Sequence, residues 1–195
     1  MPLPHRLRST PIPAVPAALP TALPRPLYGL VAWPCSTLDR WLRQQQQRLG
    51  VRAFGEPHLN LRAPFSAQSS EAALVDSLRG LLAHTRPFEV QVGGWRVFPG
   101  TVFLECHLSP ELLALHDHVL TLPGAPPQPY DQKEYIPHLT LALGVLPWAR
   151  DDLNSELLQL TPPVSRFTVS ALSLTREGGG EVREIHTFPL GEGTD

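Results

Sequence analysis

The sequence predicts an α+β fold of two pseudo-symmetric lobes, each an antiparallel-rich sheet with helices on its outer face, flanking a central groove. Segments typical of strands and helices occur twice in the order strand, helix, strand, helix, strand. Residues 57–61 (PHLNL) and 137–141 (PHLTL) match at four of five positions and lie 80 residues apart. Neither half has enough strands to form a sheet with a covered face alone. We therefore expect the two halves to share one groove.

The bulk composition fits one folded domain over residues 27–195. Of the 195 residues, 42% are hydrophobic and 17% are charged, as in globular proteins. The formal net charge of −2 argues against sequence-independent binding of long duplexes, which requires many Lys and Arg side chains against phosphates. A small site that grips one terminal phosphate is compatible with this charge.

Cysteine and proline usage bears on the compartment. Cys35 and Cys106 are too few for a disulfide framework or a cysteine zinc cluster, so we expect reduced thiols and a cytoplasmic protein. No apolar run is long enough to span a membrane, and we expect no membrane partner. Residues 1–26 contain eight prolines, which interrupt any signal-like segment. We interpret them as a disordered or loosely docked extension, or as a wrongly assigned translation start.

The first half shows clear start and stop signals. Pro34 ends an apolar run. Ser36 can cap a helix, Asp39 takes the capping-box position three residues later, and Gly50 is a natural terminator. The predicted elements are a strand over 28–33, a helix over 36–50, a strand over 57–65 and a helix over 71–84.

The second half repeats this order and adds a final strand. Turns are predicted at Gly93–Gly94, at Pro99–Gly100 and at 178–180, and Ser109-Pro110 is a strong helix start. A proline-rich loop covers 123–130. The predicted elements are strands over 88–92 and 100–107, a helix over 110–122, a strand over 135–143, a helix over 149–160, and strands over 166–175 and 182–190.

The two PHLxL segments carry the functional prediction. Side chains alternate between the faces of a strand, so the leucines of each segment enter a core. His58 and Asn60 then point together to the other face, as do His138 and Thr140. A pseudo-twofold axis between the lobes would set the two pairs opposite each other across the groove.

This set of side chains suits phosphoester chemistry. A neutral histidine can accept a proton from water while a protonated one donates to the leaving oxygen. Asn60 and Thr140 can hold the phosphate oxygens. Two histidines at equivalent points of a duplicated pattern favour this interpretation over ordinary sheet residues. We predict His58 and His138 as catalytic, with no metal and no cofactor, because a cyclic phosphate brings ring strain and a tethered leaving group.

Over residues 27–190 the sequence resembles the two-histidine (2H) phosphoesterases, specifically the 2′-5′ RNA ligase-like cyclic phosphodiesterases. That family carries two His-x-Thr/Ser-x motifs on strands of a two-lobed α+β fold. The resemblance implies hydrolysis of 2′,3′-cyclic phosphate ends to 2′-phosphates, with reversible 2′-5′ RNA ligation in some members. The implied partners are RNA ends or small cyclic nucleotides, with no obligate protein partner.

One departure from the family pattern affects the predicted activity. Asn60 stands where the family has Thr or Ser. An amide still supplies donors but is bulkier, so we predict reduced or altered turnover. A catalytically weakened module that binds nucleotides or RNA ends is the first alternative function. A different hydrolase, or a structural protein that kept only the fold, is the second.

Several further residues are secondary candidates. We predict that Arg62 shares the face of Asn60 and binds phosphate, as an alternative to pointing into solvent. Tyr130 and Tyr135 can stack a base at the groove mouth or close the end of the strand, and the sequence favours neither. His116 lies two residues from the next histidine, which is not metal-ligand spacing on a helix, and is expected to be partly exposed. Trp148 is expected in the core or in the packing between the lobes.

Overall fold

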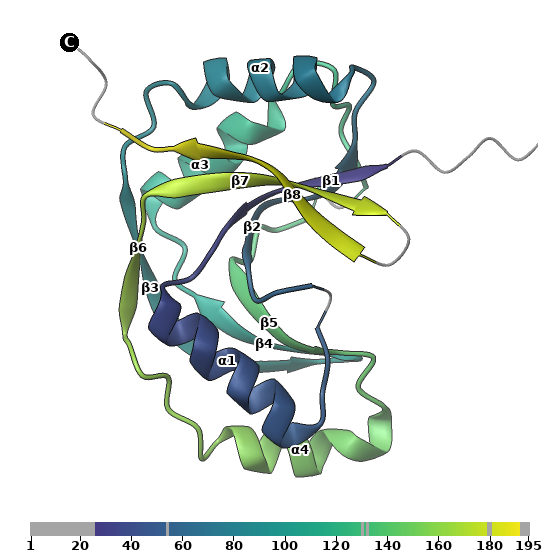
Figure 1. Cartoon of the computed structure of the whole chain (residues 1–195). Coiled ribbons are helices and arrows are strands. Elements are labelled where there is room, and N and C mark those ends of the chain that lie inside the picture. The colour runs from purple at the N-terminus through teal and green to yellow at the C-terminus, as the bar shows by residue number, and fades with distance from the viewer. Residues whose placement is uncertain (1–25, 54, 130, 132, 179–180, 192–195) are drawn as a thin grey trace, which may run out of the picture.

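The computed structural model describes residues 26–53, 55–129, 131, 133–178 and 181–191 (Figure 1). The predicted proline-rich extension lies outside them except for its last residue. The strands are β1 (Leu27–Ala32), β2 (Leu59–Ser66), β3 (Phe88–Phe98), β4 (Thr101–Cys106), β5 (His138–Leu143), β6 (Arg166–Val169), β7 (Ala171–Gly178) and β8 (Glu181–Pro189). The helices are α1 (Ser36–Leu49), α2 (Glu71–Leu82), α3 (Pro110–Leu120), η1 (Pro147–Ala149, a 3-10 turn) and α4 (Arg150–Leu157).

The eight strands form one curled antiparallel sheet in the order β6-β3-β4-β5-β2-β1-β7-β8 (Figure 1). Read outward from its centre, β5, β4, β3 and β6 on one side correspond to β2, β1, β7 and β8 on the other. The duplicated element order therefore folds into two pseudo-symmetric lobes that meet where β2 pairs with β5. The predicted α+β class is confirmed, with one shared sheet joining the lobes.

Helices α1 and α3 each pack against the lobe opposite to the one whose strands they connect. Helix α1 connects β1 to β2 but packs against β5, and α3 connects β4 to β5 but packs against β2. A side chain from each helix forms a hydrogen bond with a backbone carbonyl of a motif strand, at equivalent positions of the two motifs. Gln46 donates to the Leu141 carbonyl (3.1 Å), and His116 Nδ1 lies 2.6 Å from that of Leu61. Each helix thus supports the motif strand of the opposite lobe.

The core is rich in leucines, many of them supplied by the motif strands and by the helices that cover them. Leu59, Leu61, Leu139 and Leu141 are all completely buried, as the alternation predicts. Burying one such side chain contributes about 1.5–3 kcal/mol, so these positions fix which face of each strand is turned outward. None of the helices in the described residues has the length and apolar character needed to cross a membrane.

Glycines 93 and 94 do not form the predicted turn. Strand β3 runs through them, and its register against β4 shifts between Val92 and Trp95. A Cβ on Gly93 would lie 2.9 Å from the Glu105 carbonyl oxygen, so the strands approach too closely there for a side chain. Glycine permits a bulge at this point, and the chain reverses only at Pro99–Gly100.

Helix ends also differ in detail from the prediction. Cys35, and not Ser36, occupies the N-cap of α1, and no side chain bonds to the free amides there. Gly50 does end the helix in the left-handed conformation (φ 64°), where glycine has no steric penalty. The helix predicted over 149–160 is shorter, because Ala149 belongs to η1 and α4 ends at Leu157.

Two expectations about burial were wrong. His116 is buried on α3, where its ring stacks on Tyr135. Trp148 is 78% exposed, since η1 turns its indole away from the core. The periodicity of the sequence does not predict the burial of His116 or the exposure of Trp148. Each depends on whether a distant segment of the chain packs over the side chain.

Candidate functional site

The pairing of β2 with β5 brings the two motifs together. Leu59 lies opposite Leu139 in this antiparallel pair. Extending the register by one residue each way sets His58 opposite Thr140 and Asn60 opposite His138. Because the two leucines point into the core, these four neighbours face the other side of the sheet. Each histidine therefore stands across from the polar residue of the other motif.

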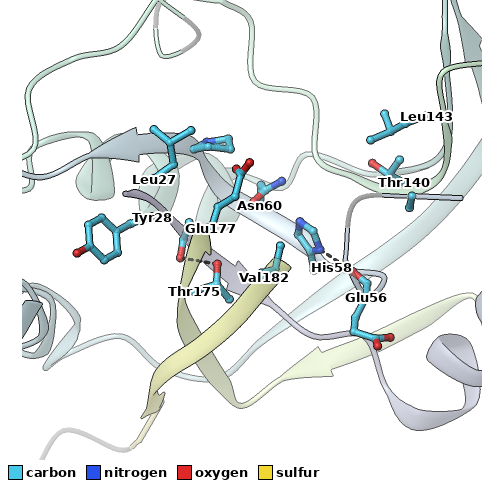
Figure 2. Close-up of a pocket in the computed structure, with 13 residues that line it drawn as sticks. Leu27, Tyr28, Glu56, His58, Asn60, Thr140, Leu143, Thr175, Glu177 and Val182 are labelled. Atoms are coloured by element: carbon cyan, nitrogen blue, oxygen red, sulfur yellow. Dashed lines mark hydrogen bonds between the residues drawn. The ribbon is translucent and has the colours of Figure 1, made fainter. Parts of the chain in front are cut away.

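A cavity of about 170 Å³ opens on this face. His58, Asn60 and Thr140 line it together with Thr175 and Glu177 from β7 (Figure 2). His138 is not among its lining residues, but it is half-buried at the start of β5, with its ring 4.5 Å from that of Phe103. The pairing of Leu59 with Leu139 brings the two imidazoles near each other, and the charge of His138 adds to the effect of burial in lowering the pKa of His58.

Both histidines are held in the same way. His58 Nδ1 lies 2.6 Å from the carbonyl oxygen of Glu56 (Figure 2), and His138 Nδ1 lies 2.7 Å from that of Ile136. The bonded carbonyl is two residues earlier in each case. A carbonyl oxygen only accepts, so Nδ1 carries the proton in both rings. Nε2 of each ring is left to exchange a proton with a substrate.

The surroundings of His58 favour its neutral form. Burial, followed by the nearby charge of His138, lowers the pKa of His58 to about 4. Trp33 contributes to this burial with an edge-on contact at 6.0 Å between ring centroids. Its indole NH donates to Ser173 Oγ and to Glu184 Oε2, both at 2.9 Å, which fixes the ring. Near neutral pH His58 is therefore a proton acceptor.

The lining of the cavity carries little positive charge. Its described residues include no Arg or Lys, and two of them, Glu56 and Glu177, are acidic. Thr175 donates its hydroxyl to the Gly29 carbonyl at 3.2 Å. Asn60 and Thr140 are then the neutral donors available for a phosphate, alongside a protonated imidazole. Sequence reasoning did not find Glu177, which lies on β7, or Trp33, which follows β1, because both are distant from the motifs in the sequence.

Arg62 does not take its predicted place on the face of Asn60. Its side chain is 0% exposed and forms an ion pair with Asp131, with Nη2 2.7 Å from Oδ2. The same Nη2 donates to the carbonyls of Ala125 and Pro126 at 3.2 Å. The register of β2 against β1 shifts beside Asn60, so strict alternation ends there. The prediction was wrong on placement, and Arg62 instead ties β2 to the loop before β5.

Tyr135 closes the end of the motif strand. Its hydroxyl donates to the Asn60 carbonyl at 2.9 Å, and its ring stacks on His116 with centroids 3.9 Å apart and planes 3° apart. Of the two roles left open by the sequence, the structure places Tyr135 in this one. Tyr130 lies outside the described residues. Within those residues no group of three or more His, Cys, Asp or Glu side chains is arranged to hold a metal.

Comparison with known proteins agrees with this geometry. The model of the 2′-5′ RNA ligase superfamily matches residues 34–181. Escherichia coli LigT, solved with 3′-AMP, is 16% identical with a TM-score of 0.58, over 86% of this chain and 99% of LigT. TT0787 of Thermus thermophilus is 18% identical with a TM-score of 0.57, over 84% and 97%. No curated protein matches by sequence. The chain belongs to the 2′-5′ RNA ligase superfamily.

Proposed function

We propose that the protein is a metal-independent phosphodiesterase that opens 2′,3′-cyclic phosphates on RNA ends or nucleotides to 2′-phosphates. One observation carries the proposal. His58 and His138 occupy equivalent positions on paired strands, each with Nδ1 bonded to the carbonyl two residues earlier and Nε2 left for a substrate. The crystal structure of LigT with 3′-AMP supports a nucleotide as the ligand of this fold.

The proposed reaction needs one proton acceptor and one donor. His58 Nε2 takes a proton from water as the water oxygen bonds to phosphorus, consistent with its lowered pKa. The bond from phosphorus to O3′ breaks, and His138 Nε2 gives its proton to O3′. The product is a 2′-phosphate beside a free 3′-hydroxyl. With a 5′-hydroxyl in place of water, the same two groups would join RNA ends through a 2′-5′ linkage.

The remaining charge develops on the non-bridging phosphate oxygens. Asn60 and Thr140, which line the cavity, are placed to donate to them. The leaving oxygen is tethered to the ribose and the five-membered ring is strained, so proton transfer and hydrogen bonding suffice without a Lewis acid. Glu56 and Glu177 disfavour a second phosphate in the cavity.

The reaction class is tested by incubating the protein with 2′,3′-cyclic nucleotides and with a short RNA ending in a cyclic phosphate, in excess EDTA. We expect turnover that EDTA does not inhibit, and a 2′-phosphate product identified by ³¹P NMR. A 3′-phosphate product would contradict the proposed bond cleavage. Loss of turnover in EDTA that is restored by a divalent cation would contradict metal independence.

A binding module is the second candidate, and Asn60 is the observation that favours it. An Asn side chain in the cavity is bulkier than the family's Thr or Ser and would displace a bound phosphate from the histidines. This function predicts nucleotide binding, measured by calorimetry, with no turnover of any cyclic phosphate.

Replacing Asn60 with threonine should separate the two. We expect Asn60→Thr to raise kcat/KM about tenfold on at least one cyclic-phosphate substrate, the effect of one better-placed hydrogen bond. Thr140→Asn is the reciprocal control and should lower kcat/KM. Unchanged turnover of every substrate in Asn60→Thr would show that Asn60 does not limit catalysis.

A further inference from the structure

A second hollow adjoins the catalytic cavity. It has a volume of about 400 Å³ and an apolar floor, and we call it the outer hollow; its lining includes Val51, Leu143, Leu146, Trp148 and Leu153. Leu143, at the end of β5, lines both the outer hollow and the catalytic cavity. The two sites are therefore adjacent, and Leu143 contributes to the wall of each.

Trp148 gives the outer hollow a large and exposed aromatic surface. The indole is 78% exposed, on a single 3-10 turn between β5 and α4. Leu143 and Leu146 beside it are also exposed. An accessible aromatic face next to a nucleotide site is a platform on which a base of any identity can stack.

Arg52 lies between the two sites. Its neighbour Val51 lines the outer hollow, and its other neighbour Ala53 lines the catalytic cavity. The Arg52 carbonyl accepts from the Leu143 amide at 2.7 Å, which fixes this loop to the end of β5. The side chain is exposed, and no ion pair joins it to another residue of the described chain. An exposed guanidinium on the segment that joins the two linings can bind a phosphate.

The acidic residues of the outer hollow indicate which part of a nucleotide it accepts. Asp152 and Glu156 line it, and Glu156 pairs with Arg48 at 3.1 Å. Carboxylates repel a phosphate but accept hydrogen bonds from the amino groups of a base. A base in the outer hollow and a phosphate at Arg52 satisfy both charges, whereas an acidic peptide would not.

We propose that the outer hollow binds the nucleotide that precedes the cyclic-phosphate nucleotide, with its base stacked on Trp148 and the connecting phosphate at Arg52. This rests on the proposed function and names its substrate class: an RNA end of two or more nucleotides, preferred over a cyclic mononucleotide. Leu143 lines both sites, Trp148 lines the outer hollow, and Arg52 lies in the sequence between one residue of each lining.

The test compares kcat/KM for a five-nucleotide RNA ending in a 2′,3′-cyclic phosphate with kcat/KM for the matching cyclic mononucleotide. We expect Trp148→Ala to lower the ratio of the two about tenfold, the usual effect of losing one stacked base. Trp148→Phe should restore most of it. Leu158→Ala is the control, since Leu158 is comparably exposed (73%) but lies outside the outer hollow. An unchanged ratio in Trp148→Ala would overturn the proposal.

Arg52→Ala provides an independent readout. It should lower the RNA ratio and also make RNA turnover less sensitive to salt, because one phosphate contact is lost. An unchanged salt dependence would remove Arg52 from the subsite.

Failure of the proposed function can be told apart from failure of the subsite. If the wild-type protein turns over neither substrate, the same RNA with a 2′-phosphate end is titrated by fluorescence anisotropy. Weaker binding by Trp148→Ala supports the subsite, and equal binding overturns it. Concentration-dependent dimerisation that Trp148→Ala abolishes, with RNA binding unchanged, would assign the outer hollow to a second copy of the chain.

Discussion

His58→Ala and His138→Ala should each lower kcat/KM for a 2′,3′-cyclic nucleotide by a factor of about 10² to 10⁴, the usual contribution of one positioned proton-transfer group. Each imidazole is oriented by a backbone carbonyl, so alanine removes the Nε2 atom while leaving the strand pairing in place. Initial rates over a range of substrate concentrations give the value. Circular dichroism spectra that match the wild type would show that folding is retained.

A matched control and a double variant sharpen this result. His84→Ala removes an exposed histidine beyond the end of α2 and should leave kcat/KM unchanged. Because the acceptor and donor act in one step, the double variant should lose little more than either single variant. Either single variant retaining more than about a tenth of wild-type kcat/KM would contradict the acid–base pair.

Arg62→Ala should destabilise the protein by about 3–5 kcal/mol, the usual cost of leaving one buried charge without its partner. The substitution leaves the almost fully buried Asp131 carboxylate without its partner. It also removes the donor to the Ala125 and Pro126 carbonyls. The loop before β5 loses one of its attachments to β2, at a junction with a single paired position. Urea denaturation followed by circular dichroism measures the loss.

An exposed ion pair serves as the control for Arg62. Arg79 pairs with Asp76 on α2 at 2.5 Å, and both side chains are more than half exposed. Arg79→Ala should therefore change the unfolding free energy by less than about 1 kcal/mol. A combined Arg62→Met and Asp131→Leu variant should recover part of the lost stability, since no charge is then buried alone. Equal small effects of Arg62→Ala and Arg79→Ala would show that the buried pair contributes little.

The elements and the motif faces were accessible from the sequence. The repeated order of elements and the leucine alternation in the two PHLxL segments depend on local patterns, and a strand with one buried face leaves little choice of register. The sequence predicted that His58 and His138 act together, because the duplication places them at equivalent positions of the two motifs. Extending the same alternation to Arg62 failed, because β2 is irregular against β1 beyond Asn60.

The remaining features depend on contacts between distant segments. Gly93 lies in a strand because Glu105 of the neighbouring strand approaches too closely for a side chain. His116 is buried because Tyr135 and the Leu61 carbonyl lie over it. Trp33 adjoins His58 only through the ends of β1 and β2, and its sequence neighbours give no indication of this contact. Local periodicity carries no information about such approaches.

The central claim is that neutral His58 accepts the proton, and the pH dependence of kcat/KM tests it most directly. This ratio reports groups of the free enzyme. Burial lowers the pKa of His58 to about 4, so the acid limb of kcat/KM should rise with pH through that value, and kcat/KM should fall again at higher pH once the proton donor of the pair is deprotonated. His58→Ala should lack the rising limb. A rising wild-type limb near 6.5, the ordinary value for histidine, in place of the one near 4, or a rising limb near 4 that persists in His58→Ala, would contradict the account.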